Sequence, residues 1–227
     1  MCRTSLMRSP FSPLYFLFFL GLLLWVIFSI KLGLITLTFR KLGLDPESAL
    51  TLLITSLLGS AVNLPLFTLR VSAPQPPVER AGYGLLRRPP VPFTGRTQVA
   101  VNVGGCLVPV LFSLYLVKTY GVPPLHILAA TAFVTFVSYL MSRPIPGVGI
   151  GMPILVAPLS AALAAIFLGE DFRAPLAYIS GSLGVLIGAD LLRLKDIRRM
   201  AAPIASIGGA GTFDGIFITG LVAVLLS

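Results

Sequence analysis

The chain is poor in charged residues. Only 11% of its 227 residues are charged, whereas 56% are hydrophobic, and its mean hydropathy is +0.95. A soluble protein of this length needs far more charge to cover its surface. The composition therefore excludes the soluble class and indicates a polytopic membrane protein.

Histidine and cysteine are also scarce. The one histidine, His126, is too few for a histidine-based metal centre. The two cysteines lie in different contexts, Cys2 near the N-terminus and Cys106 within an apolar run. We therefore expect neither a disulfide nor a metal site, and no bound cofactor.

Basic residues outnumber acidic ones by 17 to 8, which gives a net charge of +9. Most of them lie in short segments between apolar runs. In such segments they set membrane topology and contact anionic lipid headgroups, so we expect the lipid bilayer as partner and no nucleic acid.

The apolar runs predict an all-α polytopic membrane protein with about seven transmembrane helices. The whole chain, 1–227, then forms a single transmembrane domain in the cell (plasma) membrane. With the N-terminus inside, twelve of the 17 basic residues lie on the inner side, which predicts an N-in, C-out orientation. The expected spans are approximately 14–37, 49–69, 99–117, 125–141, 153–168, 174–192 and 202–226.

Two connections between these runs are distinctive. Residues 70–98 hold five arginines and six prolines, which argues against regular structure and predicts a cytoplasmic surface loop. Within it we expect Arg87 and Arg88 to contact anionic headgroups. Residues 142–153 hold three prolines and three glycines, which excludes a regular helix there. Both a re-entrant loop and a tight external turn remain open for this connection.

Local patterns predict helix ends and close helix contacts. Asp45 can cap a helix in which Pro46 takes the first position. Asn102 lies next to Gly104 and Gly105, a pattern that predicts a close helix contact with an interhelical hydrogen bond.

Two acids, Asp190 and Asp214, lie within apolar runs and cannot be placed in loops. A charge within a bilayer costs at least ~2.5–3.5 kcal/mol, so such a carboxylate indicates a functional site. Both can lie at similar shallow depth on consecutive antiparallel helices. Gly184 and Gly188, with Gly181, form one helix face that we expect to pack on another helix, and Asp190 points away from it.

An aspartate dyad has a defined chemistry. Two carboxyls about 3 Å apart share one proton, so that one activates water while the other polarises a carbonyl. Such a pair hydrolyses peptide bonds without a metal or a nucleophilic serine. Gly211 and Gly215 bracket Asp214 and leave room beside it and Phe213 for an extended chain of substrate.

The run Gly211-Thr212-Phe213-Asp214 resembles the GxGD motif of the intramembrane aspartyl proteases: presenilins, signal peptide peptidases and, more distantly, type IV prepilin peptidases. The resemblance implies catalytic roles for Asp214 and Asp190 and a membrane-embedded peptide as substrate. The second glycine of the motif is replaced by Phe213. The whole chain also resembles an uncharacterised, largely archaeal, prokaryotic membrane family with no assigned activity.

Other interpretations of the same residues stay open. Asp190 can pair with Arg193 at the membrane interface, and Asp214 can cap the last helix. The aspartates can also bind protons or cations in a transporter or channel. A non-catalytic scaffold that works through the 70–98 loop is a further alternative.

Overall fold

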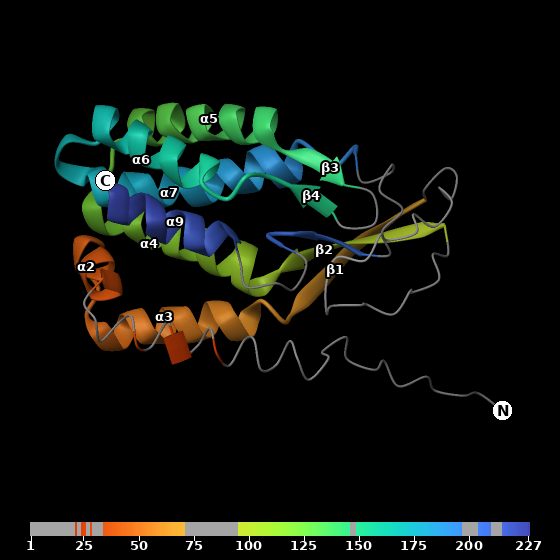
Figure 1. Ribbon diagram of the computed structural model, residues 1–227, viewed down its shortest axis with the longest axis horizontal. Coiled ribbons are helices and arrows are strands. Elements are labelled where there is room, and N and C mark those ends of the chain that lie inside the picture. The colour runs from red at the N-terminus through yellow and green to blue at the C-terminus, as the bar shows by residue number, and fades with distance from the viewer. Residues whose placement is uncertain are drawn as a thin grey trace.

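The fold combines a bundle of apolar helices with short strands gathered at one end of the bundle (Figure 1). The computed structural model describes residues 21, 24, 25, 28, 34–70, 95–145, 149–196, 204–209 and 215–227. The helices are α2 (Leu34–Lys41), α3 (Pro46–Gly59), α4 (Val108–Tyr120), α5 (Pro124–Met141), α6 (Val156–Leu168), α7 (Arg173–Val185) and α9 (Gly215–Leu226). The π-helical segments η1 (Val103–Leu107) and η3 (Leu186–Leu191) lengthen α4 at its start and α7 at its end, and the 3₁₀ turn η2 (Glu170–Phe172) precedes α7.

The strands form two small sheets. They are β1 (Asn63–Arg70), β2 (Arg96–Asn102), β3 (Arg143–Ile145), β4 (Gly149–Gly151) and β5 (Ile204–Ile207). The larger sheet has the order β1-β2-β5, with β1 antiparallel and β5 parallel to β2. The register of β1 on β2 shifts between Pro65 and Phe67, as expected at a bulge. The β3–β4 pair is antiparallel.

Helix α7 lies at the centre of the bundle and packs on α4, α5, α6 and α9. Its Tyr178 is fully buried. Glycine makes the α5 contact possible, because a Cβ at Gly184 would lie 2.6 Å from Cβ of Val134, and one at Gly188 would lie 3.0 Å from Cβ of Ser138. The expected packing of a glycine face on another helix is thus confirmed for these two glycines, whereas Gly181 faces α6 and α9.

Within the part of the chain that the structure describes, three helical stretches are long and apolar enough to cross a membrane: Val103–Tyr120, Pro124–Met141 and Arg173–Leu191. Helices α3 and α6 are shorter but also apolar. The outer surface carries large apolar side chains, among them Leu125 and Leu128 of α5, which are 74% and 68% exposed. Such a surface suits contact with lipid and supports a membrane protein.

The all-α expectation is wrong in three places, each of which was expected to be helical. The 49–69 helix ends at Gly59 and continues as β1, the 99–117 helix begins with β2, and the 202–226 helix begins with β5. A short apolar run does not distinguish a strand from a helix by its periodicity. The expected 70–98 loop likewise begins and ends in strands, at Arg70 and from Arg96.

Other expectations agree with the structure. Helix α3 begins at Pro46 as expected, with Asp45 at the N-cap position in an extended backbone conformation, but the Asp45 side chain makes no capping hydrogen bond. Helices are present over 125–141, as α5, and over 174–192, as α7 with η3. The described part of 142–153 contains β3 and β4 and no helix. Residues 71–94, with Arg87 and Arg88, and most of 14–37 lie outside the described residues.

The described connections fall at two ends of the bundle (Figure 1). Residues 43–45, 121–123 and 169–172 lie at the end opposite the strands, together with the end of α9. The strands and the end of η3 lie at the other end, which we call the sheet end.

Candidate functional site

Asp190 lies in η3, at the sheet end of the long helical stretch formed with α7. Its side chain is partly buried, and Oδ2 accepts a hydrogen bond of 2.7 Å from the backbone amide of Gly208. Gly208 directly follows strand β5. Asp190, at the end of η3, is therefore hydrogen-bonded to Gly208 in the segment that leads into α9.

The contacts of the helix face opposite Asp190 explain which way the Asp190 side chain points. Gly188, two residues earlier, packs against Thr135 and Ser138 of α5. Two residues turn a helix by about 160–200°, the smaller angle belonging to a π-helix. Asp190 therefore points away from α5 and toward β5. π-helical turns within α-helices often occur at functional sites, which is consistent with a functional site here.

Three contacts hold Gly208 in place. Strand β5 pairs with β2, and Oγ of Ser206 donates a hydrogen bond of 2.5 Å to Oδ1 of Asn63 in β1. Gly208 itself lies against η1, where an added Cβ would be 2.6 Å from the carbonyl carbon of Gly105 and 2.7 Å from the amide nitrogen of Cys106. Its φ of +88° is also one that favours glycine. Glycine is therefore the residue that fits this position.

Asn102 builds the surface on which Gly208 lies. The side chain is 1% exposed and uses both ends of its amide. Nδ2 donates to the Ser60 carbonyl at 2.7 Å and to Oδ1 of Asn63 at 3.2 Å, while Oδ1 accepts from the Gly105 amide at 2.8 Å. The last bond caps η1. The predicted interhelical hydrogen bond of Asn102 is thus confirmed, between the start of η1 and the end of α3.

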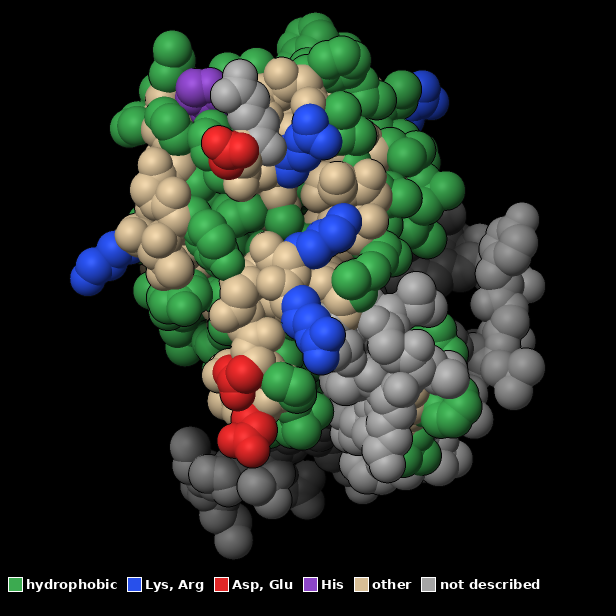
Figure 2. All heavy atoms as spheres, turned by 90° about the vertical axis from the view of Figure 1, so that its left-hand side faces the viewer, with side chains coloured by type: hydrophobic (Ala, Val, Ile, Leu, Met, Phe, Trp, Pro, Cys, Tyr) green, Lys and Arg blue, Asp and Glu red, His purple; other side chains and the backbone are tan. Residues whose placement is uncertain are grey.

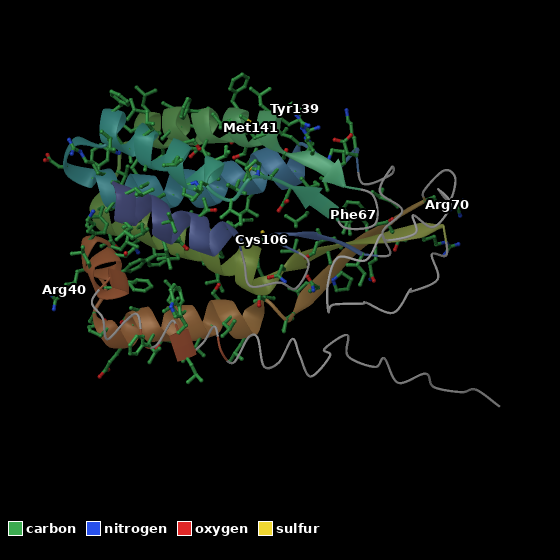
Figure 3. The ribbon with its side chains drawn as sticks, in the orientation of Figure 1. Arg40, Phe67, Arg70, Cys106, Tyr139 and Met141 are labelled. Atoms are coloured by element: carbon green, nitrogen blue, oxygen red, sulfur yellow. The ribbon has the colours of Figure 1, made fainter. Side chains whose placement is uncertain are left out.

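The glycine pair beside Asn102 makes the predicted close contact as well. Gly104 packs on α3, where its carbonyl accepts a hydrogen bond of 3.0 Å from Oγ of Ser56. An added Cβ at Gly104 would lie 2.9 Å from the carbonyl carbon of Gly59. Figure 3 shows Cys106 of η1 at the sheet end of the bundle, near the start of the strands.

Arg193 does not pair with Asp190, so that interpretation of Asp190 is wrong. Its guanidinium forms an ion pair with Asp196 at 3.1 Å. It also donates to the carbonyls of Tyr139 at 2.6 Å and Ser142 at 2.8 Å, and to Oγ of Ser142 at 3.2 Å. The same group lies over the Tyr139 ring, 4.3 Å from its centroid. Arg193 therefore joins the end of η3 to the end of α5, where Figure 3 shows Tyr139.

The second predicted catalytic acid, Asp214, lies outside the described residues, as do Gly211 and Phe213. Gly215 is the first residue of α9. Ile216, the next residue, is buried in one apolar cluster with Leu186 and Ala189 of η3. Ala189, the neighbour of Asp190, and Ile216, two residues after Asp214, thus belong to the same cluster.

Sequence analysis missed the residues that support Asp190. Asn63 and Ser206 lie in strands where the sequence predicts helices, and Gly208, in the expected glycine-rich break of the last span, directly follows β5. The Gly208-Gly209 pair was a usable signal, because both residues have positive φ. Among the described residues, no group of three His, Cys, Asp or Glu side chains could hold a metal ion.

A family model matches residues 57–226, which is most of the chain. The chain belongs to the DUF1614 family. The description of this family is "protein of unknown function", which confirms the expected membership of an uncharacterised family. No curated protein and no solved structure matches the chain. The DUF1614 match includes Asn102, Asp190, Gly208 and Asp214. The archaeal and GxGD resemblances remain predictions.

Proposed function

We propose that the chain is an intramembrane aspartyl-type hydrolase that cuts peptide bonds of membrane segments with Asp190 and Asp214. The observation that carries the proposal is the hydrogen bond from the Gly208 amide to Asp190. It holds Gly208, six residues before Asp214 in the chain, at the carboxylate of Asp190.

Chain length supports an approach of the two acids. Six residue steps separate Gly208 from Asp214. Because an extended chain covers at most ~3.3–3.6 Å per residue, Asp214 lies within about 20 Å of Gly208. From the other side, Ile216 lies two residues after Asp214 and shares a buried cluster with Ala189, the neighbour of Asp190. Both observations are compatible with a dyad.

The chemistry of the site follows from its hydrogen bonds. Oδ2 of Asp190 accepts the Gly208 amide, and among the described residues Oδ1 accepts no hydrogen bond. Oδ1 is the atom left to share a proton with a second carboxyl and to bind water. One carboxyl of the pair activates that water, and the other polarises the scissile carbonyl.

A transition-state probe tests the hydrolase directly. The full chain in detergent is photolabelled with an apolar peptide isostere whose hydroxyl mimics the tetrahedral intermediate, because such analogues bind more tightly than substrates. We expect labelling of the native chain and loss of it in Asp190→Asn and Asp214→Asn. Glu47→Gln, an exposed acid at the opposite end, is the control and should label normally. Equal labelling of all four proteins would reject the dyad.

A second candidate is a proton- or cation-coupled transporter that uses the same aspartates. The two π-helical segments are compatible with it, because π-helical turns within longer helices often occur at functional sites. Reconstituted vesicles with an internal pH dye separate the two functions. Flux that follows a pH or cation gradient and is lost in Asp190→Asn, without labelling by the isostere, would support the transporter.

We further propose a multi-pass protein of the plasma membrane with the sheet end in the cytoplasm and Arg87 and Arg88 on anionic headgroups. Support comes from the separation of the described connections between two ends of the bundle (Figure 1). A membrane-impermeant maleimide applied to intact cells should label Lys118→Cys and leave Arg70→Cys unlabelled. The reverse pattern would invert the orientation.

A further inference from the structure

A cleft lies at the end of the bundle opposite the sheet. Its volume is about 200 Å³, and its lining includes Lys41, Tyr120, Asp171 and Arg173. These residues come from the ends of α2 and α4, from η2 and from the start of α7. Figure 2 shows this end face, on which basic side chains follow one another from top to bottom near the middle.

Among the described residues, no carboxylate forms an ion pair with the two cations of the cleft. The structure shows no ion pair within 4.0 Å for Lys41 or Arg173 among the residues that it describes. Nζ of Lys41 donates a hydrogen bond of 3.3 Å to the Val224 carbonyl. Two cations at one cleft favour an anion between them, and a phosphate group accepts several hydrogen bonds from such side chains.

Asp171 adds a negative charge to the cleft, which therefore carries charges of both signs. A carboxylate on the lining disfavours a ligand that is only anionic. It suits a ligand that carries a cation with N–H donors at a short distance from its phosphate. The phosphoethanolamine group, a phosphodiester joined to a primary ammonium, has this combination of charges.

The position of the cleft favours a lipid over a soluble ligand. It lies where apolar helices end, which is where the headgroup layer of a bilayer begins. Leu225 and Leu226 of α9 are 38% and 46% exposed and directly precede Ser227, which also lines the cleft. Acyl chains can pack on these side chains while the headgroup enters the cleft. The volume is below the about 300–1,000 Å³ of pockets that enclose drug-sized ligands, so it suits a headgroup rather than a whole molecule.

We propose that this cleft binds the phosphoethanolamine headgroup of a phospholipid, with the phosphate between Lys41 and Arg173 and the ammonium on Asp171. The lipid then joins the ends of α2 and α7. This site is separate from Asp190, which lies at the sheet end, and does not depend on the proposed hydrolase activity.

Native mass spectrometry of the full chain tests the proposal. The protein is released from micelles that contain equal amounts of phosphatidylethanolamine, phosphatidylcholine and phosphatidylglycerol. We expect selective retention of phosphatidylethanolamine. Arg173→Gln should weaken it about tenfold, or about 1.4 kcal/mol. This variant leaves the bond from Lys41 to Val224 intact, so its fold is preserved for the measurement.

Two more variants identify the contacts. Asp171→Asn should lower retention of phosphatidylethanolamine and leave phosphatidylglycerol unchanged, because only the first lipid has an ammonium group. Lys118→Gln removes an exposed cation at the same end, outside the cleft, and should change nothing. Equal retention of the three lipids by the native chain, or an equal loss in Lys118→Gln, would overturn the proposal.

A soluble anion is the remaining source of phosphate. The delipidated protein is therefore melted with inorganic phosphate or with soluble phosphoethanolamine at millimolar concentration. We expect no rise in melting temperature from either, and a rise when phosphatidylethanolamine is returned. A rise with inorganic phosphate that Arg173→Gln abolishes would show a soluble-anion site and would overturn the lipid assignment.

Discussion

The amide of Gly208 donates a hydrogen bond of 2.7 Å to Oδ2 of Asp190, which lies 18 residues earlier in the chain. The bond joins the end of η3 to the short parallel strand β5. It fixes Asp190 relative to the segment that enters α9. Changes at Gly208 should therefore affect both the stability of the sheet end and the chemistry of Asp190.

Gly208→Ala should destabilise the protein by roughly 2–5 kcal/mol, because it combines a positive φ with overpacking against the η1 backbone. Thermal unfolding in detergent measures this effect. Gly121→Ala is the matched control, because Gly121 has a φ of +58° but open space around its Cα. That variant should lose only roughly 1–2 kcal/mol. Equal losses would mean that the contact of Gly208 with η1 is unimportant.

Arg193→Gln should lower stability by roughly 1.5–3 kcal/mol, because the charged hydrogen bonds to α5 are lost. Arg193→Lys should recover little of this lost stability, since an ammonium group cannot reproduce the planar guanidinium over the Tyr139 ring. A double-mutant cycle between Arg193 and Asp190 should give a coupling below about 0.5 kcal/mol. A larger coupling would restore the ion-pair interpretation of Asp190.

Gly184→Ala should lower stability by roughly 1–3 kcal/mol, because the new methyl group meets Val134 of α5. Val134→Ala should relieve only the part of the clash that involves Cγ1 of Val134, because Cβ, which alanine keeps, also lies 2.6 Å from the new methyl group. The double variant should still be more stable than the sum of the two single changes predicts. Gly188→Ala gives the contrast, because its methyl group meets the backbone carbonyl of Thr135, which no side-chain change removes. Rescue of Gly188→Ala by Val134→Ala would contradict this packing.

Asn102→Ala should lower stability by roughly 1–3 kcal/mol for each buried partner left without a hydrogen bond. Asn102→Asp should be worse than Asn102→Ala, since a carboxylate cannot donate to the Ser60 carbonyl. Thermal unfolding ranks the two variants. The reverse order would mean that the amide of Asn102 is not used as a donor.

The helical part of the fold could be predicted where apolar runs have clear ends. Asp45-Pro46 marked the start of α3, and Pro124 to Met141 formed one helix, because helix caps and prolines act locally. The strands could not be predicted in this way. Asn63 to Leu69 is as apolar as the helix before it, and its partner strand β2 follows a long interval in the sequence. Only tertiary pairing determines that it is extended.

The candidate site, like the fold, could be predicted only in part. Asp190 was found because a carboxylate in an apolar run is costly. Its actual partner, Gly208, could not be inferred, since a backbone amide leaves no side-chain signal. The nearby Arg193 suggested an ion pair by its spacing, but the ends of α5 supply better acceptors for it at Tyr139 and Ser142.

Helices α3 and α6 have 14 and 13 residues, which correspond to about 20 Å at about 1.5 Å per residue. Each carries an apolar side chain that is well exposed: Leu58 of α3 is 67% and Leu163 of α6 is 50% exposed. A hydrocarbon layer about 30 Å thick exceeds both lengths. If these two helices cross a bilayer, the hydrophobic mismatch would thin it around them or tilt their neighbours. The protein should therefore be more stable in lipids with short acyl chains, and it should concentrate in thin regions of its membrane.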